Sequence, residues 1–82
     1  MNINTMPLSC IPLGSRGEIV SIKSNLKNRD RLIELGFTKD TEIIPLHISP
    51  MGDPTAYFIR GSVMALRKED ADNIFIKIKE EY

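Results

Sequence analysis

The sequence predicts a small, mostly β fold, a barrel of about five short antiparallel strands with one short α-helix between the first two. Segments rich in apolar and β-branched residues alternate with turn-forming residues along the chain. One further segment carries both the start and the stop signals of a helix. The chain has 82 residues, which suffice for one domain. Closing a small sheet into a barrel removes most of its exposed edges, which favours this architecture.

The N-terminal part of the chain carries few structural signals. Residues 1–6 are polar and are expected to be frayed. Residues 7–13 place leucines between turn-forming residues, which is typical of an irregular segment that packs on the core. A loop is expected over residues 14–17. Residues 18–23 are rich in β-branched side chains and predict the first strand.

The predicted helix spans residues 25–35. Asn25 or Asn28 can cap its N-terminus, because a side-chain oxygen accepts a hydrogen bond from an unpaired backbone N–H. Leu32 and Leu35 fall on one face of this helix, where they are expected either to join the core or to meet a partner.

A specific signal ends this helix. Gly36 stands where a left-handed residue closes a helix, and Phe37 follows at the position that packs back on the last turn. We therefore expect positive φ at Gly36 and a contact between Phe37 and Leu32. Asp40 is expected to form the next turn, because aspartate tolerates left-handed geometry better than most residues.

Residues 41–48 predict the second strand. Pro45 lacks an N–H, so this strand is expected to lie at an edge or to carry a bulge there. Alternation predicts one buried face made of Ile44, Leu46 and Ile48.

Residues 49–54 are the densest turn signal in the chain and predict an exposed reversal between two strands. Pro50 suits the second position of a type I turn, and Gly52 suits the fourth. Pro54 favours extended geometry at the residue before it. Gly52 and Pro54 are therefore expected to be structural.

The remaining elements are short. Strands are expected over residues 55–60 and 63–66, with Gly61 breaking the chain between them. Residues 68–73 suit a single helical turn. Residues 74–79 predict the last strand, with three isoleucines on its buried face: Ile74, Ile76 and Ile78.

Composition narrows the classes of function. Lys plus Arg and Asp plus Glu number 11 each, so the formal net charge is zero. Nucleic-acid-binding proteins usually carry a positive surplus that neutralises phosphates. No apolar run approaches the ~20 residues that span a bilayer, and the first residues lack the pattern of a signal peptide. We expect a cytoplasmic protein without membrane insertion and without a nucleic-acid partner.

Side chains for catalysis or metal binding are sparse. Cys10 is the single cysteine and His47 the single histidine, and they lie far apart in the sequence. A nucleophile needs a base beside it, and a transition-metal site needs several clustered ligands. Acidic residues near the C-terminus follow no calcium-loop pattern. We therefore expect no enzymatic activity, no cofactor and no tightly bound ferrous or zinc ion in the monomer.

Four blocks of sequence carry a resemblance to a known family. In chain order they are Arg31-Leu32-x-Glu34-Leu35-Gly36-Phe37, Thr41-Glu42-Ile43, Pro50-x-Gly52-Asp53-Pro54 and Leu66-Arg67-x-Glu69-x-Ala71-x-x-Ile74. In this order and spacing they resemble the ferrous iron transport protein A (FeoA) family. Where the family usually has glycine this chain has Asp40, which can take the same turn at some cost.

The resemblance implies an SH3-like barrel, with residues 1–82 as a single domain. It implies a cytoplasmic accessory protein without catalytic activity of its own. The implied partner is ferrous iron transport protein B, a membrane permease with a cytosolic GTP-binding domain. The iron in the family name is the transported ion, and the family has no agreed metal-binding residues to carry over to this chain.

The sequence leaves three functions open. The first is docking on the permease, the second is a direct metal sensor or chaperone on the same barrel, and the third is an SH3-like domain associated with nucleic acid. For the first, the helix and the 49–54 turn are expected to supply the contact residues: Arg31, Leu32, Leu35, Met51 and Asp53. Five further positions are expected to be structural turns: Gly36, Asp40, Gly52, Pro54 and Gly61.

Overall fold

The computed structural model describes residues 4–23 and 27–79 of the chain. Its elements, in order, are β1 (Met6–Pro7), a 3-10 turn (Leu8–Cys10), β2 (Gly17–Ile22), α1 (Arg29–Glu34), β3 (Glu42–Ile48), β4 (Thr55–Ile59), β5 (Ser62–Leu66), α2 (Lys68–Ala71) and β6 (Ile74–Ile78). The strands form one antiparallel sheet in the order β1-β6-β2-β3-β4-β5. This confirms the predicted mostly β fold.

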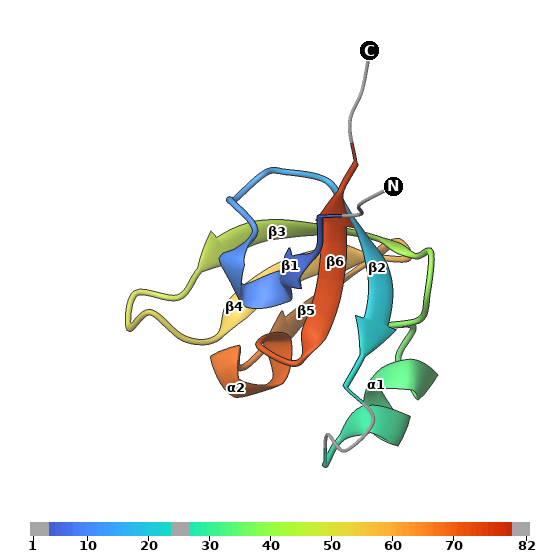
Figure 1. Ribbon diagram of the computed structural model, residues 1–82. Helices are drawn as coiled ribbons and strands as arrows, with labels where there is room; N and C mark the ends of the chain where they lie inside the picture. The colour runs from blue at the N-terminus through green and yellow to red at the C-terminus, as the bar shows by residue number, and fades with distance from the viewer. Residues whose placement is uncertain (1–3, 24–26, 80–82) are drawn as a thin grey trace.

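The sheet curls around a single core. In Figure 1, β2 and β6 run down the front while β3 and β4 cross behind them, and both helices lie at the end of the barrel away from the chain termini. The buried apolar side chains come from every layer of this arrangement: Leu8, Ile11, Ile19, Leu32, Phe37, Ile43, Tyr57, Ile59, Leu66, Ala71, Ile74 and Ile76. The last strand therefore buries two of its three predicted isoleucines, while Ile78, near the strand's end, is 38% exposed.

The N-terminal segment departs from the prediction. Met6, expected to be frayed, pairs with Ile76, and Pro7 pairs with Phe75, so a sixth strand stands where an irregular segment was predicted. Met6 also packs against the buried cluster. The pairing joins residues 68 and 70 positions apart, which no local pattern in the sequence can indicate.

Helix α1 is shorter than predicted at its N-terminus. Asn28 is its N-cap residue, but its side chain makes no capping hydrogen bond. Instead, its Nδ2 donates to Asp70 Oδ1 at 3.4 Å, across to α2. The expected side-chain cap at Asn28 is therefore wrong, and Asn25 lies outside the described residues.

The predicted helix ending is confirmed. Gly36 has φ 111°. The Phe37 N–H donates to the Leu32 carbonyl at 3.0 Å, and the Gly36 N–H donates to the Ile33 carbonyl at 3.0 Å. These two bonds make a Schellman motif. Phe37 is fully buried in the same cluster as Leu32, so the ending fixes α1 on the barrel.

The predicted buried face of β3 is wrong. Ile43 and Pro45 are buried, whereas Leu46 and Ile48 are 41% and 49% exposed. Ile43 pairs with fully buried Ile59, so Ile43 and Pro45 face the core in the first half of the strand. A register shift between Pro45 and His47 supplies the predicted bulge.

Three further predicted turn positions have left-handed backbone geometry, and a fourth, Pro54, follows a cis peptide that was not predicted. Left-handed φ occurs at Asp40 (70°), Gly52 (89°) and Gly61 (81°), and the Asp53–Pro54 peptide is cis. The Gly52 N–H donates to the Ser49 carbonyl at 2.8 Å, which closes the turn at the head of the 49–54 reversal.

Candidate functional site

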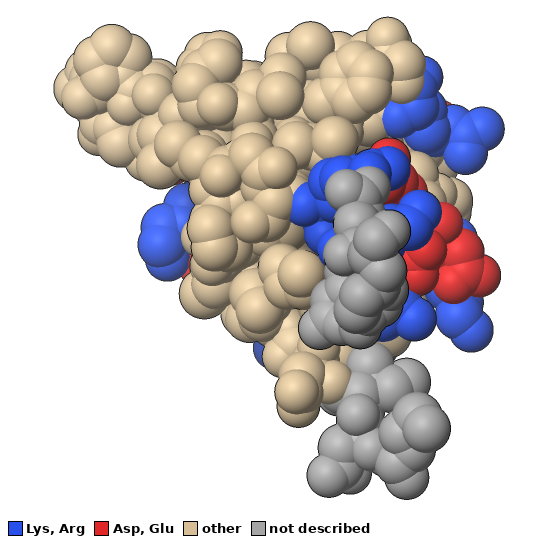
Figure 2. Space-filling view, turned by 90° about the horizontal axis from the view of Figure 1, so that it is seen from above, with Lys and Arg blue, Asp and Glu red and all other residues tan. Residues whose placement is uncertain are grey.

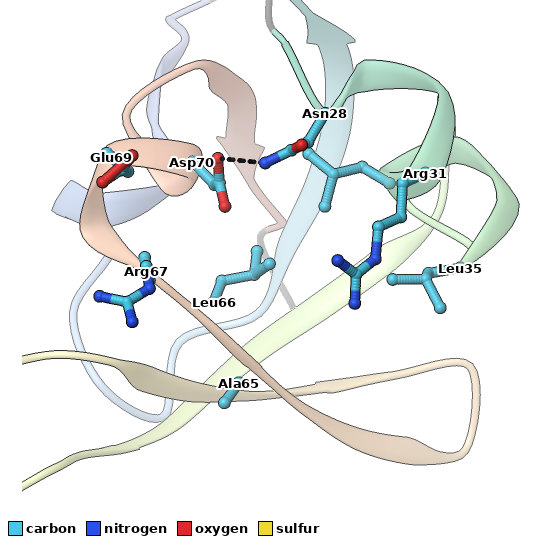
Figure 3. Close-up of a pocket in the computed structure, with 9 residues that line it drawn as sticks. Asn28, Arg31, Leu35, Ala65, Leu66, Arg67, Glu69 and Asp70 are labelled. Carbon is cyan, nitrogen blue, oxygen red and sulfur yellow. Dashed lines mark hydrogen bonds between the residues drawn. The ribbon is translucent and has the colours of Figure 1, made fainter.

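A groove of about 410 Å³ lies between α1 and the segment that joins β5 to α2. Asn28, Arg31, Leu32 and Leu35 line it from the α1 side. Ala65, Leu66, Arg67, Glu69 and Asp70 line it from the other side. Its size falls within the ~300–1,000 Å³ that is common for ligand pockets, and Figure 3 shows these side chains converging from both walls.

The groove has an apolar floor. Leu32 and Leu66 are 3% and 6% exposed, so they belong mainly to the core and present only their outer atoms. Leu35 is 40% exposed and extends the apolar surface outward along α1. Such a floor favours an apolar side chain of a bound segment, because burial removes apolar area from water.

Two arginines face the groove from opposite walls. In Figure 3 the guanidinium groups of Arg31 and Arg67 lie on either side of Leu66. Both residues are exposed. Within the part of the chain that the structure describes, neither has an ion pair or a side-chain hydrogen bond. Both are therefore available to a carboxylate, which guanidinium groups bind with paired hydrogen bonds.

Contacts from distant segments hold the α2 wall. Asp53 Oδ1 accepts the Lys68 N–H at 2.9 Å, at the start of α2. The Ser9 hydroxyl donates to Asp72 Oδ1. Lys68 Nζ lies 3.1 Å from Asp72 Oδ2. The first two contacts thus tie two distant segments of the chain to one short helix, and the third lies within it.

The contacts at Asp72 predict a pH-dependent stability. The Ser9 hydrogen bond, followed by the Lys68 contact, lowers the pKa of Asp72. A lowered folded-state pKa adds stability above the unfolded pKa of about 3.9 and loses it as pH falls through the folded value. We expect Asp72→Asn to be less stable than wild type at neutral pH, and the difference to shrink below pH ~4. Urea midpoints measured across this range test it.

Asp30→Asn is the matched control, since Asp30 is exposed and its side chain has no hydrogen bond among the described residues. A stability difference for Asp72→Asn that stays constant down to the acid limit would contradict the linkage.

The structure separates the predicted contact residues into two groups. Arg31 and Leu35 line the groove. Leu32 is 3% exposed, because its face of α1 packs on the core, which is the first of the two roles expected for it, and only its outer atoms reach the floor of the groove. Met51, 91% exposed, and Asp53 belong to the 49–54 reversal, which Figure 1 places on the opposite side of the molecule from α1.

The helix and the 49–54 turn therefore do not form one surface. Sequence reasoning did not assign Arg67 or Asp70 to the site, because their place opposite α1 depends on the path of β5 through the fold.

Further apolar side chains are exposed away from the groove. Leu46, Ile48 and Met51 are exposed on β3 and the reversal after it. Figure 2 shows that Lys, Arg, Asp and Glu gather mainly on one side of the face seen from above. The groove differs from this surface, because it combines apolar side chains with charged ones of both signs: Arg31, Arg67, Glu69 and Asp70.

The side chains that the sequence offered for catalysis or metal binding do not form a site among the described residues. Cys10 is exposed in the 3-10 turn and His47 is exposed on β3. Across residues 4–23 and 27–79, no three His, Cys, Asp or Glu side chains are grouped to hold a metal ion. The helices described there are too short to cross a membrane.

Comparisons with solved structures support the fold. A FeoA-like protein from Clostridium acetobutylicum is 29% identical, with a TM-score of 0.88 over 100% of this chain and 94% of the other. FeoA from Stenotrophomonas maltophilia, solved with zinc and described as a prokaryotic SH3 domain protein, is 29% identical with a TM-score of 0.77. That match covers 88% of this chain and 89% of the other. The barrel is thus SH3-like.

Sequence comparison gives the family. A fusion of Fe(2+) transport protein A with the Fe(2+) transporter FeoB, from Porphyromonas gingivalis, is 32% identical over 73 residues. The match covers 89% of this chain but 9% of the fusion protein. The FeoA domain model matches residues 6–78, which is nearly all of the described chain. The chain therefore belongs to the FeoA domain family, which is associated with ferrous iron transport.

Proposed function

We propose that this protein is a cytoplasmic, non-enzymatic accessory protein of ferrous iron uptake that binds the cytosolic part of a FeoB-type permease. The observation that carries the proposal is the relative in which a FeoA domain and a FeoB transporter share one chain. Fusion keeps a domain at an effective concentration of about millimolar near its partner. A separate FeoA protein reaches the same transporter by binding to it.

The groove supports a protein partner of this kind. It offers an apolar floor flanked by two arginines, with Glu69 and Asp70 on the α2 side. A small groove of this type suits a transient contact that buries less than ~1,200 Å². Arg31 and Leu35 are exposed groove residues that this proposal shares with the sequence prediction.

The test is iron uptake in cells that lack the gene. We expect ferrous uptake to fall in the deletion strain and to recover with the wild-type gene. Arg31→Glu is expected to restore it incompletely, because the substitution reverses a charge at the edge of the groove. Lys39→Glu, which changes an exposed cation outside the groove, is the matched control and should restore uptake.

Association is measured in the same strains, by co-purification of the tagged protein with the permease from detergent-solubilised membranes. Normal uptake without the gene, together with no recovery of the permease, would reject the proposed function.

A further inference from the structure

Strand β5 has an edge that is unpaired among residues 4–23 and 27–79. It is the last strand in the sheet order, and within these residues it pairs with β4 alone. The β4–β5 hairpin has a two-residue turn, Arg60 and Gly61, and pairs Ile59 with Ser62. In such a hairpin the residues flanking the turn form a hydrogen-bonded pair, and bonded and non-bonded pairs then alternate.

This alternation places specific backbone groups on the open edge. Ser62, Met64 and Leu66 direct their N–H and C=O groups toward β4, so Val63 and Ala65 direct theirs away from it. Among the described residues, no backbone hydrogen bond outside the sheet uses Val63 or Ala65. An edge with free donors and acceptors is a template for another strand.

The open edge of β5 borders the groove. Both Ala65 and Leu66 line the groove. Consecutive residues of a strand point to opposite faces of the sheet. A cavity that touches both therefore runs along the edge of the strand instead of over one face, and α1 forms its far wall, as Figure 3 shows.

The side chains around this edge alternate in character. Leu66 and Leu32 are buried and face inward. Arg67, the next residue after Leu66, lies toward the outside of the groove together with Arg31. A strand added to β5 would direct alternate side chains to these two environments. The inward environment favours an apolar side chain, and the outward one favours a carboxylate.

We propose that the groove binds an extended segment of alternating apolar and acidic residues, which adds to the free edge of β5 as a further strand. Main-chain hydrogen bonds to Val63 and Ala65 hold the segment, and its carboxylates meet Arg31 and Arg67. Strand addition of this kind takes affinity from the backbone and specificity from alternate side chains. The inference rests on the proposed function, in that the segment belongs to the cytosolic part of the permease.

The first test uses the full-length, ¹⁵N-labelled protein and a hexapeptide of alternating leucine and glutamate, blocked at both ends. We expect shift changes along β5 and slower hydrogen exchange at the Val63 and Ala65 amides, because peptide carbonyls would then bond them. Binding should weaken as salt rises, since the Arg31 and Arg67 contacts are exposed.

Two altered peptides separate backbone pairing from charge. A hexapeptide of alternating leucine and lysine keeps the backbone and reverses the charge. The second altered peptide is the leucine–glutamate peptide with two consecutive N-methylated residues at its centre. It keeps the charge but loses a backbone N–H donor on each edge of the peptide strand. Both should fail to protect the Val63 and Ala65 amides. Equal binding by the N-methylated peptide would overturn strand addition.

Protein variants complete the test. Arg31→Glu with Arg67→Glu should weaken the acidic peptide more than ~10-fold, because like charges then meet. Lys23→Glu with Lys39→Glu makes the same charge change at exposed sites outside the groove and should leave binding unchanged. Equal losses in the two double variants would reject a specific role for the groove.

Ala65→Pro removes one outward N–H that the hairpin does not use, and an edge position of this kind tolerates proline. A dispersed amide spectrum verifies its fold, and peptide binding should be lost. If this variant does not fold, the comparison of the arginine double variant with the lysine double variant decides whether the groove binds the peptide.

Co-purification with the permease separates this inference from the proposed function. Permease recovered equally by wild type, Ala65→Pro and the arginine variant would reject the groove and retain the proposed function. If the peptide binds in the groove but the permease is not recovered, the proposed function is rejected and strand addition at the groove is retained.

Discussion

Phe37→Ala is expected to destabilise the domain by about 3–5 kcal/mol, the range observed when a buried phenylalanine is cut to alanine. Phe37 is 0% exposed and is among the largest fully buried side chains. Domains of this kind are stable by only about 5–15 kcal/mol in total. The variant should therefore lose a large fraction of its stability, which urea denaturation followed by circular dichroism measures.

Phe58→Ala is the matched control, because Phe58 is 41% exposed on the outer side of β4. The same truncation there removes less buried area and should cost about 1 kcal/mol. Equal losses for the two variants would contradict the assignment of Phe37 to the core. The comparison also bears on the groove, since Phe37 ties the end of α1 to the barrel.

The elements that sequence predicted well are those set by neighbouring residues. The end of α1 depends on Gly36 and Phe37, which stand next to each other and act through local geometry. The 49–54 reversal likewise depends on its own proline and glycine. Because local steric rules act within a few residues, the geometry of these turns can be predicted from the neighbouring residues alone.

The elements that sequence missed depend on distant residues. In β3 both alternating sets contain apolar side chains, so alternation cannot choose between Ile43 and Ile44. Ile59 on β4 makes that choice by pairing with Ile43. The groove was missed for the same reason. Arg67 lies opposite Arg31 only because of the path that β5 takes through the fold. Arg31 and Leu35 were predicted from one helix, and the other wall required the fold.

Gly36→Ala is expected to cost about 1–2 kcal/mol from the backbone alone, and Gly36→Val more, because a β-branched side chain is disfavoured further in left-handed geometry. A second cost comes from packing. A Cβ on Gly36 would lie 2.5 Å from Arg60 Cδ, so the Arg60 side chain must move. Arg60 lies in the turn between β4 and β5 and itself has positive φ (50°). The backbone of the turn therefore fixes the position of the Arg60 Cβ.

A double-mutant cycle separates the two costs. Gly52→Ala meets the same kind of backbone penalty at φ 89° with no atom within 4 Å of the new Cβ, so it measures the backbone part. Gly36→Ala should exceed it, and in an Arg60→Ala background the excess should disappear. Free energies of unfolding from urea titrations give all four corners of the cycle. An excess that persists without the Arg60 side chain would show that the close approach is not its cause, and an unchanged midpoint for Gly36→Val would contradict the left-handed helix ending itself.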